Sequence, residues 1–169
     1  MKIENSELKD VDKIFDLYRV ATNYMKSKNQ VHWPEFPRDL IINEIKENRQ
    51  WKLVIDGQIA CIWATTFNDE LIWGNKNDEP SLYIHRIATN PNYRGQFLVK
   101  QIIHWANEFG KNKNLNFIRM DTVGLNKRLI DHYKNLGFLF LGTKKLKNTN
   151  GLPHHYKDGE VCYFQKDIV

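Results

Sequence analysis

The segment of the chain best suited to binding an anion is a loop that joins a predicted strand to a predicted helix. The strand covers residues 81–89, and Pro91 prevents it from continuing. An amphipathic helix begins near Leu98, so unpaired backbone N–H groups and the positive end of the helix dipole face this loop. Arg94 and Lys100 flank the loop and add positive charge. The pattern is compatible with a phosphate site, and equally with an ordinary strand-to-helix connection that binds nothing.

Three side chains in neighbouring segments have the chemistry to move protons. His85 lies in the predicted strand, and an imidazole with an ordinary pKa of about 6.5 can act as a base near neutral pH. Arg86 is expected to point to the opposite face of the strand, because side chains alternate there. Asp121 is a second candidate base, and Tyr133 is a phenol on an apolar helical stripe. Each also has a structural interpretation, as a hydrogen-bonded strand histidine, an ion-pair partner and a core tyrosine.

Composition limits the classes of protein to which the chain can belong. Its 169 residues are 41% hydrophobic and include 5 Trp, 7 Tyr and 9 Phe, which suffices for one folded domain over residues 1–169. The longest apolar run, residues 59–64, is far shorter than the about 20 residues of a membrane-spanning helix. Two cysteines are too few for a disulfide framework, and no apolar stretch follows the N-terminus. We therefore expect a cytoplasmic protein with no membrane partner.

Charge is divided unevenly along the chain. Residues 1–84 hold 11 Lys and Arg against 14 Asp and Glu, a net charge of −3, whereas residues 85–169 hold 14 against 6, a net charge of +8. The basic half favours an anionic ligand such as a phosphorylated cofactor, nucleic acid or anionic lipid, or is simply a solvated basic face. The sequence has neither an aromatic-and-basic RNA signature nor a recognition-helix motif, so we expect no nucleic-acid partner.

Hydrophobic periodicity predicts a mixed α/β (or α+β) domain. Apolar residues recur every three to four positions after Asp10, within residues 98–109 and after Asn126, which predicts helices. Asp56-Gly57 separates two strand-like runs and predicts a tight hairpin. Alternation of helices and strands along the whole chain predicts a sheet covered by helices. Strands are expected at residues 51–55, 59–67, 81–89, 117–123, 138–144 and 161–165, with a further strand at 70–73.

Several of these segments, in order, resemble the GNAT superfamily of N-acetyltransferases, which use acetyl-CoA. The resemblance covers nearly the whole chain, because a helix pair and a hairpin also fall in the expected places. It implies a central mixed, mostly antiparallel sheet of six to seven strands with helices on both faces. The matching runs are LYIHRIATNPNYRG at 82–95, the amphipathic helix after it, FIRMDTVGLN at 117–126, and the stretch from Asn126 through Tyr133 to Leu136-Gly137-Phe138.

The resemblance also implies a reaction, in which an acetyl group passes from acetyl-CoA to a primary amine by direct attack. Backbone groups of a splayed strand would stabilise the developing oxyanion. Tyr133 matches the family's tyrosine that protonates the leaving thiolate, and His85 is the candidate base that deprotonates the amine. The residues implied to contact CoA are Ile87, Ala88, Thr89, Arg94, Gly95, Gln96, Phe97, Leu98, Val99, Lys100, Asn126 and Tyr133.

The sequence departs from the family pattern in the loop that binds the pyrophosphate. The family pattern is Gln/Arg-x-x-Gly-x-Gly/Ala, whereas here the run is RGQFLV, with Phe97 and Val99 at the two glycine-type positions. Glycine there lets phosphate oxygens approach the main chain. The Phe97 ring must point away or obstruct, and a helical backbone would leave both residues unstrained. The alternative to an active enzyme is therefore a catalytically weakened or inactive module that binds or senses CoA.

The acceptor is expected to be a small-molecule or peptide amine. His32, Trp33 and Trp73 are predicted to form the walls of its pocket, although a tryptophan beside proline often belongs to the core. The acidic N-terminal half would suit a cationic amine. His154 and His155 adjoin each other without a third ligand, so we expect no metal. An edge strand could pair between two subunits, which leaves a homodimer possible.

Overall fold

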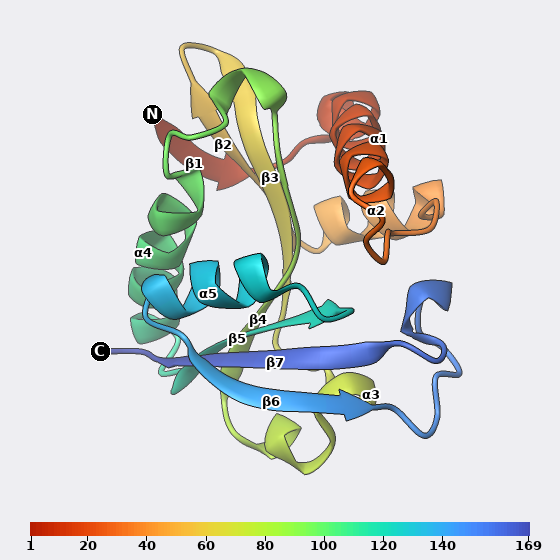
Figure 1. Cartoon of the computed structure of the whole chain (residues 1–169). Helices are drawn as coiled ribbons and strands as arrows, with labels where there is room; N and C mark the ends of the chain where they lie inside the picture. The colour runs from red at the N-terminus through yellow and green to blue at the C-terminus, as the bar shows by residue number, and fades with distance from the viewer.

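A seven-stranded sheet forms the centre of the molecule, with its strands in the order β1-β2-β3-β4-β5-β7-β6. The computed structural model describes residues 1–169 (Figure 1). Every neighbouring pair of strands is antiparallel except β4 and β5, which are parallel. The predicted mixed, mostly antiparallel sheet is therefore confirmed. The strands are β1 (Lys2–Asn5), β2 (Gln50–Ile55), β3 (Gln58–Thr66), β4 (Ser81–Thr89), β5 (Phe117–Val123), β6 (Leu139–Lys145) and β7 (Glu160–Asp167).

Helices cover both faces of the sheet, as predicted (Figure 1). The side chains of β3 alternate between the two faces of the sheet. Cys61 packs in a core cluster with α4 and α5, whereas its neighbour Ile62 packs in a second cluster with α1 and α2. None of the helices is both long enough and apolar enough to cross a membrane. The helices are α1 (Val11–Ser27), α2 (Arg38–Lys46), α3 (Glu70–Trp73), α4 (Leu98–Lys111) and α5 (Lys127–Asn135), with short 3-10 helices η1 (Leu8–Asp10), η2 (Gly74–Asp78), η3 (Pro91–Tyr93) and η4 (His154–Tyr156).

The hairpin between β2 and β3 turns at the predicted dipeptide. Asp56 and Gly57 both have positive φ angles, 49° and 76°. A two-residue turn with positive φ at both positions matches the right-handed twist of the strands on either side. Asp and Gly are residues that tolerate this backbone conformation, so the dipeptide alone sufficed to predict the position of the turn.

The prediction of a strand at residues 70–73 is wrong, because this segment is the one-turn helix α3. Its start is fixed locally: Asn68 Oδ1 accepts a hydrogen bond from the Glu70 N–H at 3.3 Å, as an asparagine does when it initiates a turn. The helical turn then buries Ile72 and Trp73 in a small cluster with Tyr83. Four residues contain too few repeats for apolar periodicity to separate a strand from a helical turn.

The two parallel strands stay together over only part of their length. Ser81–Tyr83 of β4 pair with Phe117–Arg119 of β5, and beyond these residues the two strands separate (Figure 1). Beyond these residues the edge of β4 that faces β5 has no strand to pair with. The sheet is therefore split at its centre, between the part made by β1 to β4 and the part made by β5, β7 and β6.

Candidate active site

A cavity of about 550 Å³ lies beside the diverging halves of β4 and β5. At one end it is lined by Ile87 of β4, by Asn126 and by Tyr133 of α5. At the other end it is lined by Trp33, from the connection between α1 and α2, and by the connection between β6 and β7. The latter connection, residues 146–159, contributes Leu152, Pro153, His155 and Tyr156.

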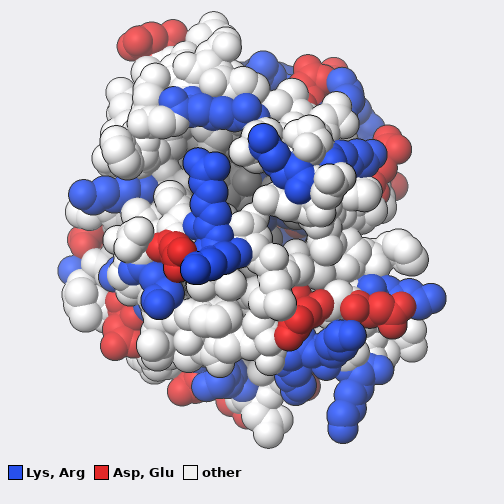
Figure 2. Space-filling view, in the orientation of Figure 1, with Lys and Arg blue, Asp and Glu red and all other residues white.

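The loop before α4 presents a row of unpaired backbone N–H groups. From Gly95 to Val99 no N–H has an acceptor within the chain, and no side chain caps the helix. The first N–H groups of any helix lack intrahelical partners, and the dipole of this 14-residue helix adds positive potential there. Figure 2 shows Lys and Arg side chains around a hollow in the face on which α5 lies in Figure 1. Arg94 and Lys100 are both exposed, and the Arg94 guanidinium lies 4.8 Å from the centre of the Tyr24 ring.

Phe97 does not have the helical backbone considered from the sequence. Its φ and ψ are 55° and 31°, so it occupies the left-handed region at the N-cap of α4. This conformation costs a non-glycine residue roughly 1–2 kcal/mol. The residue is 76% exposed, so the ring lies in solvent. Val99 is half-buried and packs against the core cluster under α4. Position 97 therefore has the left-handed backbone that glycine adopts readily, although the residue there is phenylalanine.

The remaining cofactor candidates lie partly in the core. Ala88 is buried in the cluster formed with α1 and α2, and Leu98 in the cluster under α4. The Thr89 hydroxyl lies 3.5 Å from the sulfur of Cys61, which is fully buried. Burial raises the pKa of Cys61 to about 11, so this thiol is not a nucleophile near neutral pH. Gly95 and Gln96 are exposed in the loop.

Asn126 and Tyr133 are positioned by α5. Asn126 is the N-cap of this helix, and its Oδ1 accepts a hydrogen bond from the Leu129 N–H at 3.1 Å. Tyr133 is buried, with its ring centre 5.0 Å from that of Phe164, and its hydroxyl has no hydrogen-bond partner within the chain. Burial raises the pKa of Tyr133 to about 12, with smaller contributions from the charges of Cys61 and Asp121. The phenol therefore keeps its proton at neutral pH.

A bulge in β4 turns His85 and Arg86 toward the same cavity. Opposite β3, Ile62 pairs with Ala88 and Ala64 with His85, so β4 contains one residue more than β3 in this stretch. Arg86 takes a φ of 53°, which breaks the alternation of side chains. Both residues line the cavity, and the expectation that they face opposite sides is wrong.

Arg86 belongs to a buried ion pair that the sequence did not reveal. Its guanidinium lies 2.5 Å from Oε1 of Glu44, a residue of α2 that is only 4% exposed. Arg49 approaches the same carboxylate oxygen at 3.8 Å. Two arginines therefore face one buried glutamate at the wall of the cavity, and Arg49 also pairs with the exposed Glu47. The Arg86 guanidinium also lies 5.1 Å from the centre of the Phe36 ring.

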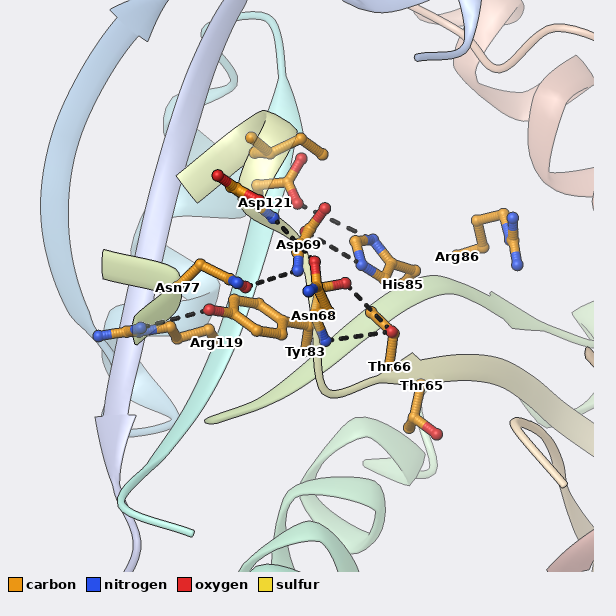
Figure 3. A network of polar contacts seen from close by, with 12 residues as sticks. Thr65, Thr66, Asn68, Asp69, Asn77, Tyr83, His85, Arg86, Arg119 and Asp121 are labelled. Carbon is orange, nitrogen blue, oxygen red and sulfur yellow. Dashed lines mark hydrogen bonds and ion pairs between the residues drawn. The ribbon is translucent and has the colours of Figure 1, made fainter. Parts of the chain in front are cut away.

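His85 lies between two carboxylates (Figure 3). Its Nε2 is 3.2 Å from Oδ2 of Asp69, and its Nδ1 is 3.9 Å from Oδ1 of Asp121. Burial opposes protonation of the imidazole, but hydrogen bonding to Asp69 and the charges of Asp69 and Asp121 raise the pKa of His85 overall. Burial raises the pKa of Asp121 to about 6. The Tyr156 hydroxyl donates to Asp121 Oδ2 at 2.6 Å and fixes this carboxylate.

Asp69 was not identified from the sequence, although the signal for its position is local. It precedes α3, and its backbone N–H donates to Oδ1 of Asn77 at 2.6 Å (Figure 3). The preceding residue, Asn68, makes its own turn contacts with Thr66. These polar contacts aim Asp69 toward His85. Nothing in the sequence indicates which of the many surface-type acidic residues lies inside the cavity.

Two predicted pocket residues lie elsewhere. Trp73 is 5% exposed and packs against Tyr163, with ring centres 5.1 Å apart, so it belongs to the core and does not line the cavity. His32 is exposed and lies at a smaller neighbouring pocket of about 350 Å³, of which Trp33 is also part. Trp33 alone of the three lines the main cavity.

A mixed sheet that splits between two parallel strands, with a helix N-terminus and a buried tyrosine at the split, defines an acetyltransferase fold. The family model described as "Acetyltransferase (GNAT) family" matches residues 12–138. The chain belongs to this family, and the resemblance seen in the sequence is confirmed.

Individual relatives agree with this assignment. The chain is 31% identical over 74 residues to YesJ, an uncharacterised N-acetyltransferase of Bacillus subtilis (strain 168); the match covers 44% of this chain and 41% of that protein. The fold is similar to that of a GNAT-family acetyltransferase from Listeria monocytogenes, with a TM-score of 0.79, 22% identity and coverage of 98% and 94% of the two chains. It is also similar to the Escherichia coli ribosomal-protein-S18-alanine N-acetyltransferase, with a TM-score of 0.68, 15% identity and coverage of 99% and 93%.

Proposed function

We propose that this chain transfers an acetyl group from acetyl-CoA to a primary amine. The observation that carries the proposal is Tyr133, whose hydroxyl has no hydrogen-bond partner within the chain and which lines a cavity opened by the separation of β4 and β5. Membership of an acetyltransferase family supports acyl transfer as the reaction class. The acceptor, the donor and the role of each residue are proposals.

The loop before α4 would hold the pyrophosphate of CoA. Its five consecutive N–H groups from Gly95 to Val99 lack acceptors, and phosphate oxygens are suitable ones. The Phe97 ring lies in solvent, so its presence does not favour the alternative of an inactive module. The free edge of β4 near Ile87–Thr89 would face the cofactor arm and offer N–H groups to the thioester carbonyl.

Tyr133 would act on the leaving sulfur. A phenol whose pKa is raised to about 12 is always protonated near neutral pH, so it can donate a hydrogen bond as negative charge develops on the sulfur. A thiol with an ordinary pKa of about 8.5 binds its proton less tightly than this phenol does. Full proton transfer therefore requires that Tyr133 regain a proton, which the reacting amine can supply.

The acceptor would enter at the other end of the cavity, past Trp33. A small-molecule amine or a peptide amine both meet the requirements of direct attack. The thiols of Cys61 and Cys162 are free and buried, which suits a reducing compartment such as the cytoplasm. A homodimer is compatible with β1 and β6 as edge strands.

The first test is calorimetric titration of the protein with acetyl-CoA and with CoA, followed by a thiol-release assay over a panel of amines. We expect stoichiometric binding of acetyl-CoA, weakened by salt, and thiol release with at least one primary amine. The matched tertiary amine should give none, because its nitrogen has no further N–H to lose after attack and so cannot form a stable amide. Absence of acetyl-CoA binding at millimolar concentrations by the folded protein would refute the proposal.

A further inference from the structure

The carboxylate of Asp121 has one oxygen for which the protein supplies no hydrogen-bond donor. The Tyr156 hydroxyl donates to Oδ2 at 2.6 Å, but Oδ1 has no donor, although the side chain is only 1% exposed. The Nδ1 atom of His85 lies 3.9 Å from Oδ1, too far for a hydrogen bond. A buried charged oxygen without a donor is destabilising. This atom therefore indicates a positively charged group that the chain does not itself supply.

Two further side chains with metal-ligating atoms lie at the same place (Figure 3). Asp69 Oδ2 is 3.2 Å from Nε2 of His85, and one donor atom from each of Asp69, His85 and Asp121 lies within 4.8 Å of the others. The three residues come from the turn before α3, from β4 and from β5, and all line the cavity. We name them the Asp–His–Asp cluster.

The cluster carries an excess of negative charge. Two carboxylates and one imidazole leave one net negative charge even when the imidazole is protonated. Arg86, next along β4, does not compensate it, because its guanidinium is directed to Glu44, 2.5 Å away. The hydroxyls of Tyr156 and Tyr163, which donate to Asp121 and to the Ile72 carbonyl, belong to phenols that are neutral near pH 7. The excess charge is therefore available to a cation.

The burial of Asp121 Oδ1 favours a small ion over a molecular cation. Because this oxygen is shielded from solvent, a group as large as a water molecule does not reach it in the folded protein. An ammonium group has about the size of water, whereas a divalent metal ion is small enough to lie among the donor atoms themselves. The unpartnered oxygen is thus better explained by a metal ion.

The donor set and its distances suit zinc. Carboxylate oxygens and imidazole nitrogens bind Zn²⁺ at about 2.0–2.2 Å, so two such ligands at a tetrahedral angle are about 3.4 Å apart. Asp69 Oδ2 and His85 Nε2, 3.2 Å apart, already have nearly this separation. The donor atom of Asp121 has to approach by at most about 1.4 Å, which rotation of a side chain can supply.

Two of the three ligands are already held in place by neighbouring groups. The Tyr156 hydroxyl fixes Asp121 with Oδ1 left free. The backbone N–H of Asp69 donates to Oδ1 of Asn77 at 2.6 Å, which fixes the turn that carries this carboxylate. Polar contacts behind the ligands orient them in metal sites and raise metal affinity.

We propose that the Asp–His–Asp cluster binds one Zn²⁺ ion and that the bound ion inhibits the protein. Three protein ligands leave one tetrahedral position open to the cavity, which a water molecule can fill. The ion occupies His85 and Asp121, the two candidate bases, and puts positive charge where a cationic amine would enter. The sequence predicted no metal from the adjacent pair His154 and His155, whereas these ligands come from segments that are far apart in the chain.

The first experiment is calorimetric titration of EDTA-treated, dialysed protein with Zn²⁺ alone. We expect one ion per chain, bound at least about tenfold more weakly by Asp121→Asn, because a neutral amide replaces an anionic ligand. Asp131→Asn, an exposed carboxylate on α5, is the matched control and should bind Zn²⁺ as the wild type does. Mg²⁺ should not compete, because it prefers oxygen ligands and retains its water. Absence of stoichiometric Zn²⁺ binding by the folded protein would overturn the proposal.

A second set of variants tests the contacts behind the ligands. Tyr156→Phe removes the hydroxyl that fixes Asp121 and should weaken Zn²⁺ binding about tenfold. Tyr163→Phe removes a neighbouring hydroxyl, which donates to the Ile72 carbonyl at 3.0 Å, and should leave binding unchanged. His154→Gln, at an exposed histidine, should also leave it unchanged. Weaker binding by His154→Gln but not by Asp121→Asn would place the ion at the histidine pair and refute the cluster.

The wild-type protein provides a test that does not depend on how the variants fold. The chain has 6 His, and the NMR signals that disappear in His85→Gln identify this residue. Zn²⁺ should shift one ring ¹⁵N resonance of His85 and leave those of His154 and His155 in place. A His85 spectrum that does not change at saturating Zn²⁺ contradicts the proposal.

The inhibitory effect rests on the proposed function and has its own readout. The acetylated amine is measured by mass spectrometry, because zinc also binds the released thiol. Saturating Zn²⁺ should lower the acetylation rate about 100-fold, since it removes the candidate bases, and EDTA should restore the rate. An unchanged rate with Zn²⁺ bound at His85 would refute the inhibition. Zn²⁺ binding at the cluster of a protein that does not bind acetyl-CoA would refute the proposed function and support the metal site.

Discussion

Under the proposed function, donor and acceptor would be recognised by different parts of the chain. The cofactor end would use main-chain N–H groups of one short segment, Gly95–Val99, which is not part of the cavity lining, and the free edge of β4. The acceptor end uses side chains from α2, β4, β5, the turn before α3 and the connection before β7. A main-chain site tolerates many side chains, whereas a site made of buried charges depends on each of them.

This difference also decides where strain and uncompensated charge accumulate. At the cofactor end, strain is confined to the left-handed backbone of Phe97. At the acceptor end, two carboxylate oxygens without donors, Glu44 Oε2 and Asp121 Oδ1, share one space with two buried cationic groups, His85 and Arg86. Substitutions at the acceptor end should therefore have large effects, and side-chain changes in the cofactor loop small ones.

The largest effect is expected from Glu44→Ala. It leaves Arg86 as a buried charge without its partner, and breaking a buried ion pair in this way costs about 3–5 kcal/mol. Urea unfolding should show this loss of stability. The control is Glu47→Ala, an exposed carboxylate that pairs with Arg49 and whose removal should cost about 1 kcal/mol or less. Equal losses in the two variants would mean that burial does not distinguish the acceptor end.

The next effect is that of Tyr133→Phe on turnover. Loss of the phenol should lower kcat about 100-fold, because general acid catalysis contributes at least about that factor. The Kd for CoA should stay nearly constant, since the ring remains packed against Phe164. Tyr24→Phe, an exposed tyrosine, is the matched control. If kcat is unchanged in Tyr133→Phe, the acid role belongs to another group.

The pH profile should report on the carboxylate of Asp121, one of the two candidate bases. The pKa of Asp121 is raised to about 6, and only its ionised form can take a proton from the acceptor. The value of kcat/KM should therefore fall as pH decreases through about 6, approaching about tenfold per pH unit. Steady-state kinetics in constant-ionic-strength buffers measure this limb. In Asp121→Asn the limb should move or disappear, and an identical limb in that variant would contradict the assignment.

The smallest effect is expected from Phe97→Gly. The ring lies in solvent, so its removal should change the Kd for CoA by less than about threefold. Relief of the left-handed backbone and the greater flexibility of glycine in the unfolded chain oppose each other, so stability should change by less than about 1 kcal/mol. Gly95→Ala is the contrasting variant, because Gly95 has a φ of 80° and alanine should distort the loop and weaken binding. Tenfold tighter CoA binding by Phe97→Gly would show that the ring obstructs the site.

The elements of the proposed cofactor end could be predicted from the sequence, because each is a local segment of the chain. The strand at 81–89, the loop and the helix after it follow one another, and Asn126 and Tyr133 share one helix. The hairpin at Asp56-Gly57 was predictable for the same reason. Local propensity and periodicity act over about ten residues, which matches the length of each of these signals.

The acceptor end could be predicted only in part, because its residues come together only in the folded sheet: His85, Asp121 and Trp33 were candidates, whereas Asp69 and Glu44 were not. Asp69 and Asp121 are 52 positions apart in the numbering, and only Asp121, in the run at 117–126, was a candidate from the sequence. Arg86 enters the cavity because of a one-residue bulge, which periodicity of two cannot anticipate. Glu44 follows an ordinary helical pattern and is nevertheless buried. Trp73 was misassigned because its aromatic character suits a pocket wall and a core equally.

The connection between β6 and β7 has a consequence for how acceptor preference can evolve. Residues 146–159 lie outside the sheet, yet they supply Leu152, Pro153, His155 and Tyr156 to the cavity. Connections tolerate insertions and substitutions better than strands do. Under the proposed function, a new acceptor pocket can therefore arise by drift in this one segment while the loop before α4, which would hold the donor, is inherited unchanged.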